Sequence, residues 1–415
     1  MFGSERIAII APAKMKNLGI NHLMSALSNL KILDFCTLLP GPYATMILSD
    51  LGADVIHIES PSRPDLARTS PPFKDGVATA HSTLNRNKRS LSLDLKHPEA
   101  IGIVKSLVKT YDIIIEQFRP SVMERLGLGY DSLSATNKEV IYCSLTGYGQ
   151  TGPYRDKAGH DINYLSIAGV NGHSGKQGDK TPLMGVQIAD LAGGALHSVI
   201  AILAAVNQRN VMGIGQFLDI SMTDGVFALN SLAGAAYLAG DQLARPESNP
   251  LNGGSFYGYY ETKDGRYLSV GSLEPKFLIG LARILDEPKI QQLGIQHTPA
   301  EQKVMKAILT DIFLSKTLSE WQRIFEDEDV CVEPVLLFEE ACQHPQLVAR
   351  KMVTSIDTIE GCQQNQIASA FHLSQSPPAY KHGGVPLGHN NEQILQELNY
   401  DPKQIGALLS SGVFG

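Results

Sequence analysis

Cysteine is scarce and scattered in this chain. Its 415 residues include five cysteines, Cys36, Cys143, Cys331, Cys342 and Cys362, and none of them forms a Cys-x-x-Cys pair. A chain of this length can bury a sizeable core without disulfides, so the pattern predicts reduced thiols in a cytoplasmic protein. No group of His and Cys has the spacing of metal ligands, and we expect no metal site.

Long apolar runs and an excess of positive charge are also missing. No stretch approaches the roughly 18 consecutive apolar residues that a membrane span requires. The net charge is −7 at pH 7, which gives no reason to expect nucleic-acid binding. The first 30 residues show no signal-peptide cleavage site, and the last three are not a peroxisomal signal. We therefore expect a cytoplasmic protein with neither nucleic acid nor membrane as a partner.

Apolar runs alternate with segments of helical spacing in the first half of the chain. Strands are predicted at residues 30–35, 53–59, 90–94, 111–116, 139–145 and 215–221, and helices at 43–52, 98–110 and 190–207. Such alternation predicts an α/β fold with a largely parallel sheet.

The pattern changes after residue 224. Residues 255–272 alternate like a hairpin with Asp264-Gly265 at its tip, and residues 274–325 read as mostly helical. Residues 332–335 are interpreted as a strand that returns to the first domain. The predicted organisation is an N-terminal extension (1–27), a large domain (28–224), a small domain (225–330) and a C-terminal return to the large domain (331–415).

Two short segments carry acid–base residues. Gly159-His160-Asp161-Ile162-Asn163-Tyr164 offers a histidine that can act as acid or base near neutral pH, or simply a helix capped by Asp161. Asp190 opens an apolar helix, where it is either an N-cap or a carboxylate placed for catalysis at the helix N-terminus.

Two further segments suit ligand binding. Arg86-Asn87-Lys88-Arg89, with Lys96 beyond it, is either a phosphate-binding cluster or a solvated turn. The glycine-rich residues 145–153 lack the Gly-x-Gly-x-x-Gly spacing, which argues against a dinucleotide site and leaves a structural loop or a close approach to another ligand.

Together these segments resemble the CoA-transferase family III (CaiB/BaiF) superfamily, and within it the α-methylacyl-CoA racemases. The resemblance covers roughly residues 28–400 and is carried by residues 39–44, 50–56, 87–90, 94–96, 146–153 and 213–219. It implies a Rossmann-like large domain built from both chain ends, a smaller central α+β domain, and an interlocked homodimer. In such dimers the active site lies between the large domain of one subunit and the small domain of the other.

The resemblance also implies roles for individual residues. Asp190 matches the aspartate used by both branches, and His160 matches the second proton-transferring residue of the racemases. Glu274 looks like the glutamate that pairs with that histidine, although a carboxylate in a first helical turn is also ordinary. We expect the backbone N–H of Asp161 to form the oxyanion hole. Coenzyme A is expected to contact Arg86, Lys88, Arg89 and Arg125 through its phosphates and Lys96 near its adenine.

The activity so implied is an isomerase reaction on an acyl-CoA. A racemase would interconvert (R)- and (S)-2-methylacyl-CoA thioesters by 1,1-proton transfer through an enolate, with no cofactor beyond the coenzyme A moiety of the substrate. The alternative is a family III CoA transferase that moves CoA between carboxylic acids through an aspartyl-CoA thioester at Asp190. Two features depart from the racemases: Ser60 stands where they often have arginine, and the link over residues 61–85 is longer. The longer link looks more like the transferases.

Overall fold

The computed structural model describes residues 25–240, 243–296 and 298–415, which form two compact units. The large unit joins the chain up to Leu145 with Ser198–Asp219 and Met352–Gly415. The second unit joins Thr146–His197 with Ile220–Lys351. Almost all of the predicted N-terminal extension, residues 1–27, lies outside the described residues.

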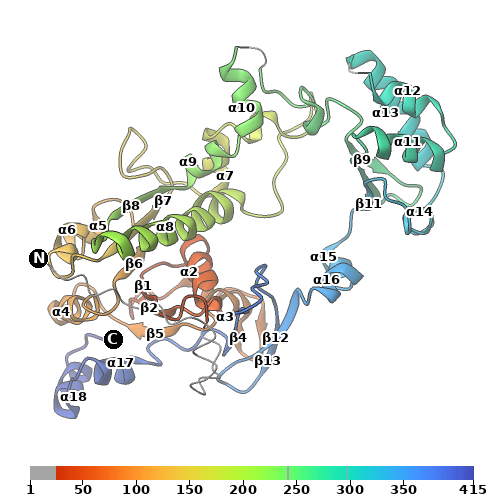
Figure 1. The fold of residues 1–415 in the computed structure, drawn as a ribbon. Coiled ribbons are helices and arrows are strands. Elements are labelled where there is room, and N and C mark those ends of the chain that lie inside the picture. The colour runs from red at the N-terminus through yellow and green to blue at the C-terminus, as the bar shows by residue number, and fades with distance from the viewer. Residues whose placement is uncertain (1–24, 241–242, 297) are drawn as a thin grey trace, which may run out of the picture. The chain divides into compact units, whose positions relative to one another are not determined.

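A six-stranded sheet is the centre of the large unit, with the order β5-β2-β1-β6-β7-β8 (Figure 1). Every pair from β5 through β7 is parallel, which confirms the predicted α/β fold. The strands are β1 (Lys31–Asp34), β2 (Asp54–Glu59), β5 (Arg89–Ser92), β6 (Ile113–Glu116), β7 (Ile141–Thr146) and β8 (Phe217–Ser221).

Apolar side chains from the strands and from α4 (Pro98–Leu107) form the main core of this unit. Leu33, Ile56, Leu91 and Ile114 have no solvent exposure, and they pack in one cluster with Ile103 of α4. Removing this much apolar surface from water, at about 25 cal/mol per Å², is the main driving force for assembling the sheet.

The C-terminal segment closes one edge of the sheet. Asn390 and Asn391, at the start of α17 (Asn391–Glu397), accept hydrogen bonds from the backbone N–H groups of Ser90 and Ser92 in β5, each at 2.9 Å. The first of these pairs is 300 residues apart in the chain. The two backbone N–H groups of the outer strand β5 at these positions are therefore satisfied.

One continuous helix, Ala189–Met212, is long and apolar enough to cross a membrane by length and composition alone, with a mean hydropathy of 1.7. Half of its most apolar 18-residue window is buried inside the protein. Its second part, α8 (His197–Met212), carries Arg209, which forms an ion pair with Asp112 at 2.9 Å.

The second unit contains a three-stranded sheet in the order β11-β10-β9. The predicted hairpin is confirmed, because β9 (Gly258–Glu261) and β10 (Tyr267–Val270) pair antiparallel around Asp264-Gly265. The prediction that residues 332–335 return to the first domain is wrong. β11 (Val332–Pro334) pairs antiparallel with β10, and Val332 is buried in the apolar core beneath this small sheet.

Four helices pack with this small sheet: α11 (Pro275–Ile284), α12 (Lys289–Gly294), α13 (Pro299–Phe313) and α14 (Leu318–Phe325). Trp321, the only tryptophan of the chain, lies in their core and donates its indole N–H to the Phe313 carbonyl at 2.9 Å. The second unit also contains α7 (Asp161–Ile167), α9 (Met222–Ala228) and α10 (Ser231–Leu238), and the large unit contains α2 (Pro40–Asp50), α5 (Val122–Arg125) and β13 (Gln363–Ile367).

Candidate active site

His160 lies immediately before α7, in the segment that follows β7. Its backbone N–H donates to the Asn163 side-chain oxygen at 3.0 Å, so the first turn of α7 fixes the backbone that carries the imidazole. The imidazole itself is exposed to solvent. A histidine on a fixed backbone with an accessible ring is suited to proton transfer with a bound ligand.

Tyr164, which the sequence analysis did not single out, fixes the loop in front of His160. Its hydroxyl donates to the Gly159 carbonyl at 2.6 Å, and its ring lies edge-on to Tyr148 at 5.1 Å. A Cβ at Gly147 would lie 2.4 Å from the ring of Tyr164, and one at Gly159 would lie 2.6 Å from it. These two glycines therefore let the loop pack against an aromatic ring.

Asp190 lies in the first turn of η3 (Ala189–Leu196), a π-helical segment that continues into α8. The interpretation of Asp190 as an N-cap is wrong, because the helix starts before it and Ile188 is the cap residue. The side chain that satisfies this helix end belongs to Asp161. Its Oδ1 atom accepts hydrogen bonds from the N–H groups of Ala189 at 2.6 Å and Asp190 at 3.1 Å.

Helix α9 packs closely against one side of η3. Gly193 of η3 faces Gly225 of α9, and a Cβ at Gly225 would lie 2.2 Å from the Gly193 carbonyl oxygen. Only glycine permits backbones to approach this closely. Segments of π-helix are rare and occur frequently at functional sites, which agrees with the position of Asp190 here.

The electrostatic environment of Asp190 favours its neutral form. Partial burial raises the pKa of its carboxyl from 3.8 to about 6, the negative charge of Asp161 adds to the rise, and the nearby His160 opposes it. A carboxyl in this range exchanges protons readily near neutral pH. The structure thus brings together His160, Asp161 and Asp190.

The backbone N–H of Asp161 is the first donor of α7. Within the part of the chain that the structure describes, no protein acceptor receives this hydrogen bond. A free donor at this point, next to both His160 and Asp190, can bind a ligand oxygen.

Glu274 lies at the start of α11 and is exposed. Its charge contributes to the raised pKa of Cys331, after the larger effect of burial. Among the described residues no ion pair joins Glu274 to His160. The pairing of these two residues stays a prediction.

Two of the predicted CoA-binding cations are buried and satisfied inside the large unit. Arg86 is 1% exposed and forms a two-pronged ion pair with Asp50, with nitrogen–oxygen distances of 2.9 and 2.6 Å. Lys88 is also 1% exposed and donates to Asp34, to the Pro42 carbonyl and to Asn85 at 3.1, 3.1 and 2.9 Å. Neither charge faces solvent, and both are engaged by partners inside the fold. Their contact with coenzyme A phosphates stays a prediction.

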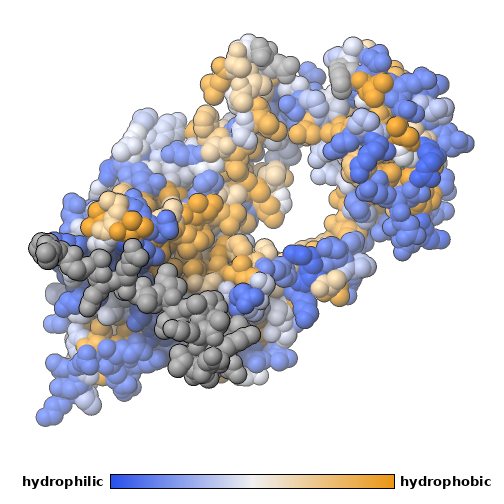
Figure 2. All heavy atoms as spheres, in the orientation of Figure 1, coloured by the Kyte–Doolittle hydropathy of each residue, from blue (hydrophilic) through white to orange (hydrophobic). Residues whose placement is uncertain are grey.

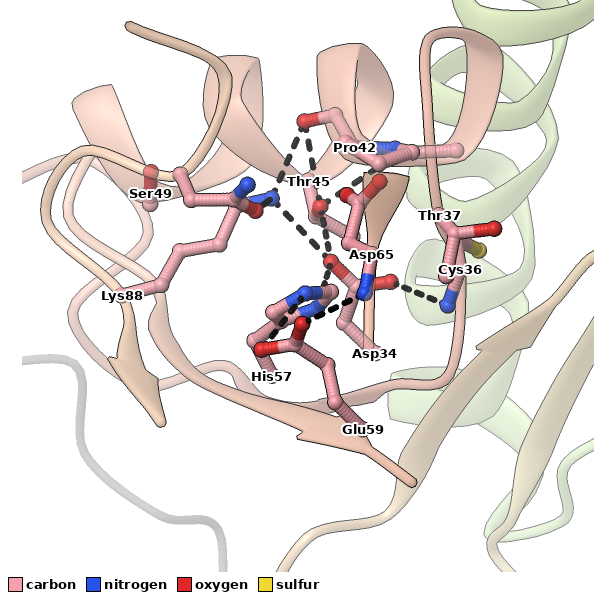
Figure 3. A network of polar contacts seen from close by, with 12 residues as sticks. Asp34, Cys36, Thr37, Pro42, Thr45, Ser49, His57, Glu59, Asp65 and Lys88 are labelled. Atoms are coloured by element: carbon pink, nitrogen blue, oxygen red, sulfur yellow. Dashed lines mark hydrogen bonds and ion pairs between the residues drawn. The ribbon is translucent and has the colours of Figure 1, made fainter. Parts of the chain in front are cut away.

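Lys88 belongs to a buried polar network at the carboxyl ends of β1 and β2 (Figure 3). The imidazole of His57 lies between Asp34 at 3.5 Å and Glu59 at 3.4 Å. Burial alone would raise the pKa of Asp34, but the charges of Lys88 and His57 hold it well below its usual range. Burial would also raise the pKa of Glu59, yet His57 and Arg68 lower it to about 2.

The other three predicted CoA contacts differ in exposure. Arg89 opens β5 and is engaged by Asp54 at 2.9 Å and Glu397 at 2.8 Å. Lys96 and Arg125 are exposed, and they follow the carboxyl ends of β5 and β6. Ligands of open parallel sheets bind at that end, so these two cations are the available candidates.

Comparison with known proteins now identifies the family. Residues 27–391 match CoA-transferase family III over most of the chain. The chain is a member of this family. The family III protein is 35% identical over 393 residues to alpha-methylacyl-CoA racemase of Homo sapiens, covering 94% of this chain and 97% of that one.

Other relatives of the family III protein are transferases. It is 32% identical to succinyl-CoA:glutarate CoA-transferase of Homo sapiens, with 93% of this chain and 89% of that one covered. Among solved structures, a CAIB/BAIF family protein from Brucella suis has a TM-score of 0.76 and 28% sequence identity, and covers 90% of this chain and 99% of that one. The family III protein is therefore similar in sequence to enzymes of both reaction types, and it shares its fold with a CAIB/BAIF family protein.

Proposed function

We propose that this family III protein is a racemase that interconverts the two configurations of 2-methylacyl-CoA thioesters. The observation that supports this most is the placement of His160 and Asp190 beside one another, with the pKa of Asp190 raised to about 6. A group that must both remove and return a proton works best when its pKa lies near the working pH.

The thioester carbonyl of the substrate acidifies the hydrogen on its α-carbon. In one direction His160 removes that hydrogen as a proton, and the electron pair of the C–H bond moves into the enolate. Asp190, in its protonated form, then delivers a proton to the opposite face of the α-carbon. In the reverse direction the carboxylate of Asp190 is the base and the imidazolium of His160 is the acid.

The enolate oxygen requires a hydrogen-bond donor, because the α-proton of a thioester remains a weak acid. The N–H of Asp161, which has no acceptor among the described residues, is our candidate for this role. Removing one such donor typically reduces kcat by about 100- to 1,000-fold. Glu274 remains our candidate for orienting His160, and the exposed Lys96 and Arg125 for binding the coenzyme A phosphates.

The second candidate activity is CoA transfer between carboxylic acids. Asp190 is only partly buried, so its carboxylate is accessible as a nucleophile. The 32% identity to a glutarate CoA-transferase favours the same possibility. This reaction needs an ionised Asp190 and assigns no proton-transfer role to His160.

An isotope-exchange experiment separates the two activities. The purified protein is incubated with 2-methylacyl-CoA in D₂O without any acceptor acid, and the mass of the thioester is followed. We expect enzyme-dependent gain of one deuteron at the α-carbon. The variant His160→Gln should lose it, whereas His372→Gln, which changes an exposed histidine of the large unit, should retain it.

The contrary result is equally clear. If no deuteron enters but CoA moves to free carboxylic acids when they are supplied, and His160→Gln keeps that activity, the protein is a transferase. Asp190→Asn should abolish either activity and serves as the background control.

The predicted homodimer is part of this proposal. Figure 2 shows apolar side chains gathered over α8, where Ile200 is 64% exposed, Val211 82% and Met212 58%. A surface of this kind usually marks a protein–protein interface. Sedimentation of the purified protein would test whether two chains associate.

A further inference from the structure

We propose that the carboxylate of Asp161 is a positioning residue for Asp190, holding the end of the π-helical segment from which Asp190 projects. The inference rests on the proposed role of Asp190 in proton transfer. It concerns the side chain of Asp161, separately from the backbone N–H considered above.

The geometry carries this inference. A single oxygen of Asp161 accepts the N–H groups of both Ala189 and Asp190, so it binds the backbone at the residue that carries the reactive carboxyl. Donors in the first turn of a helix have no partner within the helix and need an acceptor from elsewhere. Here that acceptor comes from α7, a different helix, 28 and 29 residues earlier in the chain.

The same residue couples the two proton-transferring groups. His160 precedes Asp161 directly, and the Asn163 side chain fixes the His160 backbone. A displacement of the α7 start therefore moves the imidazole and, through the Asp161 carboxylate, the backbone of Asp190. Proton transfer tolerates little displacement of the reacting groups, and a displacement of about 1 Å can reduce the rate by about 100-fold.

A carboxylate in this position also affects the proton affinity of Asp190. Its negative charge is one cause of the raised pKa of Asp190, after partial burial, while His160 acts in the opposite direction. Two helices pack against η3, namely α7 and α9. Their other titratable side chains are Tyr164 and Asp224, and neither is among the causes of this shift.

Asparagine and alanine at position 161 separate the two contributions. Asp161→Asn keeps an oxygen that can accept both N–H groups but removes the negative charge, whereas Asp161→Ala removes both. Asp179→Asn, which removes the charge of an exposed aspartate in the same unit, is the matched control.

The first measurement follows Asp190 without relying on catalysis. A water-soluble carbodiimide with an added amine labels protonated carboxyls, and peptide mass spectrometry gives the pH midpoint of labelling at Asp190. We expect Asp161→Asn to lower this midpoint by about one pH unit, the scale of a charge interaction at a partly buried site. Asp179→Asn should leave it unchanged. An unchanged midpoint in Asp161→Asn would overturn the electrostatic part of the inference.

The second measurement is the pH profile of α-deuteron incorporation. Asp161→Asn should shift the acidic limb of the profile to lower pH, with a smaller loss of maximal rate than Asp161→Ala. Asp161→Ala should lose at least tenfold in maximal rate as well, because the helix end is no longer held. Equal maximal rates in Asp161→Ala and wild type, with Trp321 fluorescence confirming that both are folded, would refute the positioning role.

The two proposals can fail separately. If the wild-type protein incorporates no deuteron but the labelling midpoint still falls in Asp161→Asn, the racemase proposal is wrong and the charge effect on Asp190 stands. In that case the maximal CoA-transfer rates are compared instead. A loss in Asp161→Ala that is larger than the loss in Asp161→Asn would support the positioning role, and equal rates in Asp161→Ala and wild type would refute it.

Discussion

Replacing Asp190 by Asn should make the folded protein more stable at neutral pH while it abolishes activity. Folding raises the pKa of this carboxyl from 3.8 to about 6. Between these values the folded state binds more protons than the unfolded state, so the free energy of unfolding falls as pH rises through that window. Above this pH window, the free energy of unfolding is lowered by the full cost of holding an ionised carboxylate in a partly buried position.

The size of the gain follows from the shift. A rise of this extent corresponds to about 3 kcal/mol at 1.36 kcal/mol per pKa unit. Because the carboxyl is only partly buried, solvent screening reduces the effect, and we expect about 1.5 kcal/mol. Asparagine has nearly the same shape and no charge, so the variant should recover this amount at pH 7.5. At pH 4.5 the folded carboxyl is mostly protonated, and about one third of the gain should remain.

Urea denaturation followed by the fluorescence of Trp321 measures both values, at equal protein concentration for each variant. Asp179→Asn, at an exposed position, should change little at either pH. A variant Asp190→Asn that is less stable than wild type at pH 7.5, or that gains equally at both pH values, would show that burial does not raise the pKa of Asp190.

Three other predictions test separate features. Lys88→Met should lower the free energy of unfolding by about 3–5 kcal/mol in urea, because it leaves the buried carboxylate of Asp34 without its cation; a loss below about 1 kcal/mol would contradict this. Gly225→Ala should reduce the exchange or transfer rate at least tenfold, since a Cβ there would lie 2.2 Å from a backbone oxygen of η3. Gly234→Ala, whose nearest neighbour would lie 3.6 Å away, should keep the wild-type rate, and equal losses in both would refute the contact argument. Lys96→Ala should raise KM for the acyl-CoA several-fold with kcat and Tm unchanged, and an unchanged KM would remove Lys96 from the CoA site.

The strands of the large sheet could be predicted from the sequence to within about two residues. Runs such as Ile113–Ile115 are bounded by turn residues, and a buried parallel strand depends mostly on such local composition. The pairing of β11 could not be predicted, because a strand of three residues carries no information about which sheet it joins. The sequence also could not predict the π-helical register of η3, since the apolar spacing of this segment matches that of an α-helix.

The candidate site was predictable in part. The motifs around His160 and Asp190 indicated both residues, but the hydrogen bonds from Asp161 to the η3 backbone depend on the tertiary structure. Arg86 and Lys88 were interpreted as phosphate ligands because positive charge is dense in the local sequence. Their acidic partners lie 36 and 54 residues away, at Asp50 and Asp34, so the local sequence gave no sign that these charges are neutralised inside the fold.

The amide side chains that cover β5 have a consequence for how this protein is made. Asn390 and Asn391 are synthesised about 300 residues after the strand whose donors they accept. Until they leave the ribosome, a nascent chain that already contains His160, Asp190 and every strand of the sheet carries an open edge able to pair with another copy. We therefore expect a message truncated just before codon 390 to encode all the proposed chemistry and still yield an aggregation-prone product.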